Sequence, residues 1–440
     1  MPFSIYPWDL KTWRAAFSVS GLPGIALLLI LLGAMLQVED LSGGGAGHSS
    51  AAAILLIRTP AIILAFLLLL SRPRIAAMRA TDLRFAYAVF AGLYFLSTLW
   101  SNIPIQTLGK SVELLLAGMV FFEASRGDGP MVRVEGLRRI TLLTMSTLGS
   151  LAVIGFCLRL PGFVQHRAGL ISSTTAQAPF LSGNGLGYVA SALILVVLAE
   201  WQARRIRAQA AILQLVFALA LFSVSASRTA LGILLLSVLL VIFKRSKVIG
   251  ALAVCAVLIA GTLFSTEIIT RLQGKQNANS FVTLSGRTVV WTAAVRQFEK
   301  NPILGVGGGV GGKMVIANIG NMYLEAMSSL HNGFLEVLTG LGITGFLIAV
   351  YMLCLATWRA WGIWNEYPQF AGTYVLIIHV WMTTIMSTGL LGWMGYEVAI
   401  FLCIITNLDV IREGTRVRVR AAIPLRWTSN SLQPQQQAAR

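Results

Sequence analysis

The chain has 440 residues, of which 56% are hydrophobic and only 12% charged, and its mean hydropathy is +0.76. One soluble core could not bury so many apolar residues, so the composition predicts a multi-span membrane protein. The net charge of +17 is interpreted as a positive-inside bias plus an Arg-rich tail, which argues against nucleic acid as a partner. The four cysteines are isolated and the four histidines form no HxxxH or HExxH pair, so no disulfide framework or zinc site is indicated.

The apolar runs predict an all-α polytopic fold with about twelve membrane helices, because a crossing needs about 20 apolar residues. The least obvious division lies in the long apolar stretch 211–244, where Arg228 is the only interior charge and both flanks are basic. Two helices that meet at Arg228 would place both flanks on one side. The predicted runs are 21–38, 52–71, 82–99, 106–124, 139–159, 179–200, 209–226, 228–244, 248–265, 332–357, 371–389 and 391–408.

The distribution of lysine and arginine predicts that both termini are cytoplasmic. The chain would then comprise membrane helices 1–9 over 1–265, a large outer loop over 266–331, membrane helices 10–12 over 332–408, and a basic cytoplasmic tail over 409–440. A smaller outer loop would span 160–178. This topology puts Arg167, Arg228 and Arg287 at the outer face. A single such arginine is often a snorkelling or headgroup-binding residue, but three near one histidine suit forked recognition of phosphate oxygens.

The stretch 285–309 predicts an amphipathic helix that starts after Ser285 and is ended by the Asn-Pro pair at 301–302. Arg287 heads the predicted apolar stripe, whereas Arg296 lies on the opposite, solvated face. The glycine-rich segment 305–312 lacks the features of a P-loop and is interpreted as a flexible hinge. The predicted apolar stripe contains Val290, Trp291, Ala294, Val295 and Phe298.

His331 precedes a glycine-punctuated apolar run, and we expect it within a helix capped by Ser328 or Ser329. On such a helix the face of His331 also carries small residues that admit a neighbouring helix. A lone histidine is more often structural, but a position at the mouth of an outward cavity favours a functional role. Asn332 could orient a sugar hydroxyl or cap the helix. The other members of the predicted face are Leu335, Leu338, Gly342 and Gly345.

The sequence here resembles the O-antigen ligase-like membrane glycosyltransferases, which include lipopolysaccharide O-antigen ligases and related polysaccharide polymerases. The resemblance is strongest in "HNGFLEVLTGLGITG", with His331, Asn332, Gly342 and Gly345 at the motif positions. It extends to "SASRTALG" around Arg228, "SGRTVVW" around Arg287, and "HRAGLI" with "SGNGLGY" around Arg167 and Asn184. It implies a GT-C-like enzyme of the bacterial inner membrane, with a periplasmic active site and no metal or other cofactor. The implied donor is an undecaprenyl diphosphate-linked glycan, the implied acceptor is a sugar hydroxyl of lipid A-core or another glycan, and membrane lipids surround the protein.

The chemistry of such a transfer suits these residue types. Cations must neutralise the departing diphosphate, which suggests Arg228 and Arg287, with Arg167 in support. The acceptor hydroxyl needs a base, which suggests His331 acting with inversion at the anomeric carbon. We expect Asn332 and Asn184 to contact substrate.

Two alternatives remain open at this level. A polymerase that joins two carrier-linked glycans would share most of the pattern. A transporter of lipid-linked glycans would also have twelve spans, but it should show related halves or ionisable groups at mid-membrane.

Overall fold

The computed structural model describes residues 63–64, 67, 81–124, 130–160, 163–167, 173–176, 183–204, 206–225, 227–263, 287–319, 329–367, 370–387, 390 and 395–422. This part of the chain is predominantly helical, as predicted. The exception is a two-stranded antiparallel sheet of β1 (Val164–Arg167) and β2 (Ser173–Ala176), in which Arg167 pairs with Ser173. The two strands lie in the predicted outer loop 160–178, and the all-α prediction did not include them.

Ten of the twelve predicted apolar runs coincide with helices. The run 21–38 lies outside the described residues, and only Ile63, Leu64 and Leu67 of the run 52–71 are described. The break predicted at Arg228 is confirmed, because one helix ends at Ser225 and the next begins at Arg228. The helices are α4 (Leu83–Leu96), α5 (Pro104–Ala124), α6 (Pro130–Cys157), α7 (Gly183–Gln202), α8 (Ala208–Ser225), α9 (Arg228–Arg245), α10 (Lys247–Leu263), α13 (Arg287–Lys300), α14 (Gly311–Ile319), α16 (Gly333–Glu366), α17 (Ala371–Met386) and α19 (Tyr396–Ala422), with the 3₁₀ turn η1 at Ser97–Leu99.

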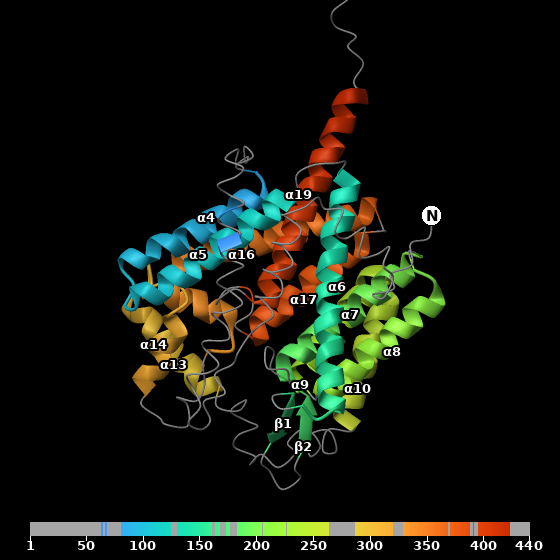
Figure 1. The fold of residues 1–440 in the computed structure, drawn as a ribbon, viewed down its shortest axis with the longest axis horizontal. Helices are drawn as coiled ribbons and strands as arrows, with labels where there is room; N and C mark the ends of the chain where they lie inside the picture. Colours follow the sequence, from blue (N-terminus) through green and yellow to red (C-terminus); the bar gives the residue numbers. More distant parts are fainter. Residues whose placement is uncertain are drawn as a thin grey trace, which may run out of the picture.

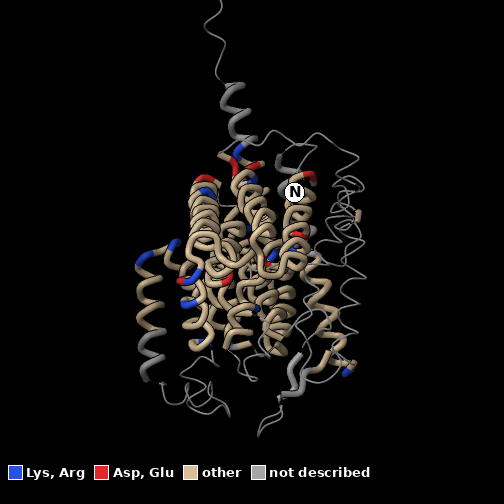
Figure 2. Tube along the Cα trace, turned by 90° about the vertical axis from the view of Figure 1, so that its left-hand side faces the viewer, with Lys and Arg blue, Asp and Glu red and all other residues tan. Residues whose placement is uncertain are grey.

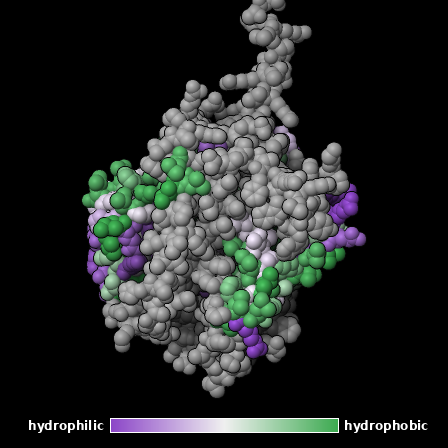
Figure 3. Space-filling view, viewed as in Figure 1, coloured by the Kyte–Doolittle hydropathy of each residue, from purple (hydrophilic) through white to green (hydrophobic). Residues whose placement is uncertain are grey.

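Four of the described helices, α5, α7, α8 and α16, are long and apolar enough to cross a membrane. The number of membrane spans, about twelve, therefore stays a prediction. Figure 2 shows the helices side by side with long uncharged stretches. Figure 3 shows broad hydrophobic areas on one face of the described surface. Large apolar side chains are exposed along α8 and α10, where they suit contact with lipid: Ile212, Leu213, Val216, Leu219, Val248, Ile249 and Leu252.

Two helices form the centre of the bundle. α7 is buried over most of its length and contacts α6, α8, α9 and α17, while α19 contacts α4, α5, α6, α16 and α17. Figure 1 shows α4 and α5 on one side of these central helices and α8 to α10 on the other. The main hydrophobic core therefore runs through α7, α17 and α19.

The last helix continues past the predicted boundary between membrane span and tail at 408/409. Asp409, which is 1% exposed, accepts hydrogen bonds from the backbone nitrogens of Leu83 and Arg84 at the start of α4. It also pairs with the side chains of Arg84, at 3.3 Å, and Arg359, at 2.6 Å. This buried carboxylate fastens α19 to α4 and α16, so the segment after 408 begins as a packed part of the bundle.

α16 is broken at Gly342, whose φ of 65° lies in the left-handed region. The break exposes the carbonyl oxygens of Thr339 and Gly340, which accept hydrogen bonds from the backbone nitrogens of Val306 and Gly307 at 3.0 and 2.8 Å. Beyond the break, the nitrogen of Ile343 donates to the carbonyl of Pro302 at 2.8 Å. A non-helical segment thus satisfies the backbone groups that the broken helix leaves free, which apolar surroundings require.

The glycine-rich segment 305–312 is a packed element of this contact, which corrects the expectation of a flexible hinge. Val306 and Val310 are buried, and the nitrogen of Gly308 donates to the hydroxyl of Ser97 at 2.8 Å. A Cβ on Gly342 would lie 2.2 Å from the carbonyl oxygen of Ile303. The lack of a side chain at Gly342 therefore allows Ile303 and Leu304, directly before this segment, to pack against α16. The sequence had predicted a neighbouring helix at this position.

Candidate functional site

The predicted amphipathic helix is confirmed as α13, which begins at Arg287 and ends at Lys300. Its buried residues are Val290, Ala294 and Gln297, spaced so that one narrow face meets α14 and the start of α16. Val295 was expected on this face, but it is 43% exposed because the face is narrower than predicted.

Arg287 is half-buried at the first turn of α13. Its Nη1 donates a hydrogen bond to the carbonyl oxygen of Met386, the last residue of α17, at 3.3 Å. Arg296 is exposed, as the predicted helix phase required. The guanidinium group of Arg287 thus lies where α13 meets the end of α17.

His331 lies just outside α16, not within it. The helix begins at Gly333, and the side-chain oxygen of Asn332 accepts a hydrogen bond from the nitrogen of Leu335 at 3.1 Å. Asn332 is therefore the N-cap, so the expected caps Ser328 and Ser329 are wrong. The φ of His331 is 50°, which a right-handed helix cannot accommodate. His331 therefore does not share a helical face with Leu335.

Burial and the positive charge of Arg287 together lower the pKa of His331 to about 4. Desolvation disfavours the imidazolium ion, and a neighbouring cation disfavours it further. His331 is therefore neutral near pH 7, which is the form that can accept a proton. The hydrogen bond from Trp291 of α13 to the carbonyl oxygen of Leu330, at 2.8 Å, brings the start of α13 and His331 into one region, although Arg287 and His331 are 44 positions apart in the sequence.

Glu336, which was not among the residues predicted for the site, is 7% exposed in the first turn of α16. Its carboxylate accepts hydrogen bonds from the nitrogens of Leu330, at 2.9 Å, and Gly312, at 3.0 Å. An isolated carboxylate inside an apolar run is costly unless it has partners, and that signal could have identified it. Glu336 is thus part of the support for the loop that carries His331.

Asn184 lies beside the start of α9. Asn184 is in the first turn of α7, and its side-chain oxygen accepts a hydrogen bond from the hydroxyl of Ser227 at 3.1 Å. Ser227 is the N-cap of α9, directly before Arg228. Arg228 is the first residue of that helix, and its side chain lies outside the described part. The same holds for the side chain of Arg167, the last residue of β1.

These two groups of residues lie at one end of the bundle. The second halves of α7 and α9 share a hydrophobic cluster with Ala371 and Val375, at the start of α17, so both helices run opposite to α17. Asn184 and Arg228, at the starts of α7 and α9, are therefore at the same end as Met386, which Arg287 contacts. β2 contacts α6, α7 and α8, and Figure 1 shows the hairpin at the end opposite to the point where α19 leaves the bundle.

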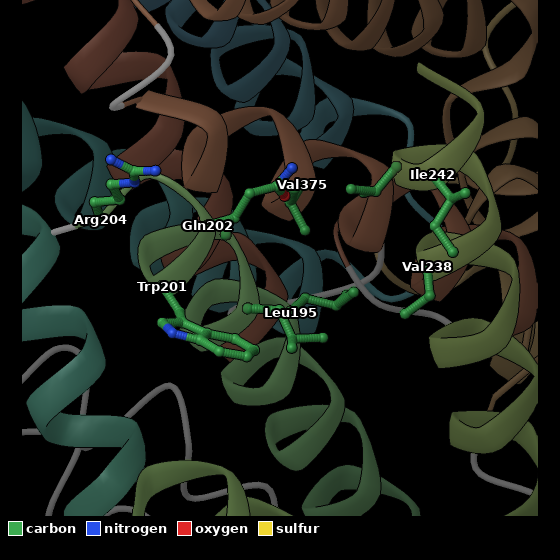
Figure 4. Close-up of a pocket in the computed structure, with 10 residues that line it drawn as sticks. Leu195, Trp201, Gln202, Arg204, Val238, Ile242 and Val375 are labelled. Atoms are coloured by element: carbon green, nitrogen blue, oxygen red, sulfur yellow. The ribbon is translucent and has the colours of Figure 1, made fainter. Parts of the chain in front are cut away.

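A cavity of about 560 Å³ lies at the other end of α7, α9 and α17. Figure 4 shows its lining, with Leu195, Trp201 and Gln202 of α7 facing Val238 and Ile242 of α9. Among the described residues, its lining is mostly apolar and includes one charged group, Arg204, and no histidine or carboxylate. The group around His331 is the stronger candidate for chemistry, because it combines a proton acceptor with a fixed cation.

Within the described ranges, no group of three or more His, Cys, Asp and Glu side chains is arranged to hold a metal ion. The cation that this part of the structure places beside His331 is Arg287. Guanidinium groups are suited to bind phosphate oxygens through paired N–H donors.

Residues 210–350 match the family model described as O-antigen ligase. The match includes Arg228, Arg287, His331 and Asn332, and it leaves Arg167 and Asn184 outside. The match supports an O-antigen ligase-like family for this part of the chain, and members of that family are glycosyltransferase-like enzymes. No curated protein matches the chain. The family and the apolar helices together indicate a membrane protein.

Proposed function

We propose that the protein is an O-antigen ligase that transfers a glycan from undecaprenyl diphosphate to a sugar hydroxyl of lipid A-core oligosaccharide. The reaction takes place at the periplasmic face of the inner membrane. The observation that carries the proposal is the link between His331 and α13: Trp291 of α13 donates a hydrogen bond to the carbonyl oxygen of Leu330, and Arg287 at the start of α13 interacts electrostatically with His331. Both residues lie in the stretch 210–350 that matches the O-antigen ligase family model.

In the proposed step, the acceptor oxygen attacks the anomeric carbon and its proton passes to a ring nitrogen of His331. The bond from the anomeric carbon to the diphosphate oxygen breaks, and its electron pair stays on undecaprenyl diphosphate. Attack from the opposite face inverts the anomeric carbon. Arg287 and Arg228 would stabilise the negative charge that develops on the diphosphate. A preorganised group of this kind typically lowers the activation free energy by about 3 kcal/mol.

The remaining residues have binding roles in this proposal. Arg167 would support the arginines at the diphosphate, and Asn184 would contact the glycan beside the start of α9. The side-chain oxygen of Asn332 already accepts a hydrogen bond from Leu335, so its amide N–H₂ group is the part that would donate to a sugar hydroxyl.

The low pKa of His331, about 4, makes it a weak base before the donor binds. A diphosphate bound to Arg287 would offset the positive charge that lowers this pKa. Donor binding would thus raise the basicity of His331 at the moment when a base is needed. The donor therefore binds first, and proton transfer from the acceptor hydroxyl to His331 follows.

The test uses the purified full-length protein in detergent with an undecaprenyl diphosphate-linked glycan and lipid A-core oligosaccharide. A ligase forms lipid A-core that carries the glycan and releases undecaprenyl diphosphate, both measured by mass spectrometry. A polymerase instead joins two glycans on one carrier without needing lipid A-core. Formation of the polymerase product would replace the ligase assignment. If neither product forms, the proposed transfer is overturned.

A further inference from the structure

The backbone of Leu330, the residue before His331, is held at both of its polar groups. Its nitrogen donates to Oε1 of Glu336 at 2.9 Å, and its carbonyl oxygen accepts from Nε1 of Trp291 at 2.8 Å. The side chain of Leu330 is fully buried, against Val290 and Val315 among others. Leu330 is therefore fixed by its backbone and by its side chain.

His331 is also fixed on its other side. Asn332 caps α16 through the nitrogen of Leu335, and the nitrogen of Glu336 donates to the carbonyl oxygen of Asn332 at 3.0 Å. Between these anchors His331 takes a φ of 50°, a conformation that costs free energy for a residue with a Cβ. Such backbone persists where the surrounding contacts over-determine it.

Glu336 is the centre of these contacts. Its second oxygen accepts from the nitrogen of Gly312, in the first turn of α14, where helix N–H groups favour a negative charge. A Cβ on Gly312 would lie 2.3 Å from Oε1 of Glu336, so the carboxylate occupies the space that a larger residue would need. Lys110 of α5 interacts electrostatically with Glu336 and donates to the carbonyl of Gly309. One carboxylate thus joins α5, α14 and α16 directly beneath the histidine loop.

We infer that Glu336 is a positioning residue, which holds the Leu330–His331 backbone in its left-handed turn and so keeps the imidazole of His331 beside Arg287. Glu336 touches neither substrate nor the reacting atoms in this role, and Trp291 assists it from α13. The effect on turnover rests on the proposed function, whereas the effect on the exposure of His331 does not.

Glu336→Gln is the principal test, because glutamine keeps the shape of the side chain. One of its two terminal groups would then present N–H donors to a backbone N–H, so one hydrogen bond is lost. We expect kcat to fall about 10- to 100-fold, as for other residues that orient a catalytic group, while KM for the lipid-linked donor changes less than about twofold. Glu299→Gln is the matched control, because Glu299 is exposed on α13, and it should retain the parental kcat.

The second readout needs no substrate. Diethyl pyrocarbonate modifies accessible neutral histidines, and peptide mass spectrometry gives the rate at each one. His331 should react several-fold faster in the Glu336→Gln variant than in the parent. His379, which is fully buried, should stay unmodified and serves as the internal measure of folding.

Unchanged kcat together with unchanged reactivity of His331 would overturn the inference. A raised donor KM with unchanged kcat would overturn it too, because Glu336 would then belong to the donor site.

If His379 becomes reactive, the Glu336→Gln variant has lost its fold, and Trp291→Phe is then the variant that tests the inference. That substitution keeps an aromatic ring, although a smaller one, and removes the hydrogen bond to Leu330. It should therefore raise the reactivity of His331 by a smaller factor, and no rise would overturn the inference. If the parent transfers no glycan, the reactivity measurement still tests the role of Glu336 while the proposed function fails separately.

Discussion

The indole nitrogen of Trp291 donates a hydrogen bond to the carbonyl oxygen of Leu330, 2.8 Å away. This contact links the helix that begins at Arg287 to the residue that precedes His331. A movement of α13 would therefore move both the proposed diphosphate-binding cation and the proposed base. α13, α14 and the start of α16 form one packed unit, whose small core contains Val290, Val315 and Leu330.

Arg287 and Arg296 lie on the same helix but in different surroundings, which gives a matched pair of substitutions. Arg287→Ala should lower glycan transfer by about 10²- to 10³-fold, the usual effect of removing one preorganised donor, whereas Arg296→Ala should leave most of it. Arg287→Lys keeps the positive charge but loses the paired N–H donors of the guanidinium group, so its rate should lie between those of the parent and Arg287→Ala. Rates are measured at equal protein levels, and equal losses from both alanine variants would contradict the assignment of Arg287.

His331→Ala should lower kcat by about 10²- to 10⁴-fold, the contribution of a general base. Binding of the lipid-diphosphate donor should persist, because the arginines would hold it. His331→Gln could keep a hydrogen bond to the acceptor but could not accept its proton, so it should be similarly slow. A glutamine variant with near-parental kcat would reassign His331 to positioning the acceptor, and loss of donor binding in the alanine variant would move it to the diphosphate site.

The pH dependence of kcat/KM reports the pKa of His331 in the free protein. Activity requires the neutral ring, so it is present above the pKa and lost as pH falls through it. Because this pKa is about 4, kcat/KM should stay nearly level from about pH 7 to about pH 5. An unshifted histidine, near 6.5, would instead produce about a tenfold loss per pH unit below its pKa. In contrast, kcat should begin to fall at a higher pH, because bound diphosphate raises the pKa in the complex.

Gly342 and Gly362 lie in the same helix and should respond oppositely to alanine. At Gly342 the left-handed backbone alone costs alanine about 1–2 kcal/mol, and the new Cβ would meet the Ile303 carbonyl at 2.2 Å. At Gly362 nothing lies within 4 Å, so alanine should stabilise the helix by about 0.5–1 kcal/mol. Thermal unfolding in detergent measures both, and a Gly342→Ala variant as stable as the parent would contradict the packed contact between α16 and residues 302–307.

The predicted topology places Lys313 outside and Lys247 inside, and both are exposed in the structure. In a background without native cysteine, a membrane-impermeant thiol reagent should label Lys313→Cys in intact spheroplasts. It should label Lys247→Cys only after the membrane is permeabilised. The reverse pattern would invert the orientation and remove the periplasmic chemistry with it.

The sequence by itself determined most of the helices and the types of residue available for chemistry. Apolar runs and the single charge at Arg228 located the helices, because a chain in lipid must satisfy its backbone hydrogen bonds within each segment. The Asn-Pro pair at 301–302 likewise predicted the end of α13. These are local properties, and they can be derived from neighbouring residues along the chain.

Only the tertiary structure decided how the site is held. The break at Gly342 depends on residues 302–307, about 40 positions earlier, which supply partners for the backbone groups that the break exposes. The left-handed turn at His331 is held by contacts from three separate helices. Glu336 and Trp291 hydrogen-bond to the backbone of Leu330, and the nitrogen of Gly312 donates to the same Glu336 carboxylate. The helical period predicted His331 on a continuous face with Gly342, because period alone assumes that a helix is unbroken. Hydrogen bonds between distant segments outweighed that local preference, and they placed the imidazole beside Arg287.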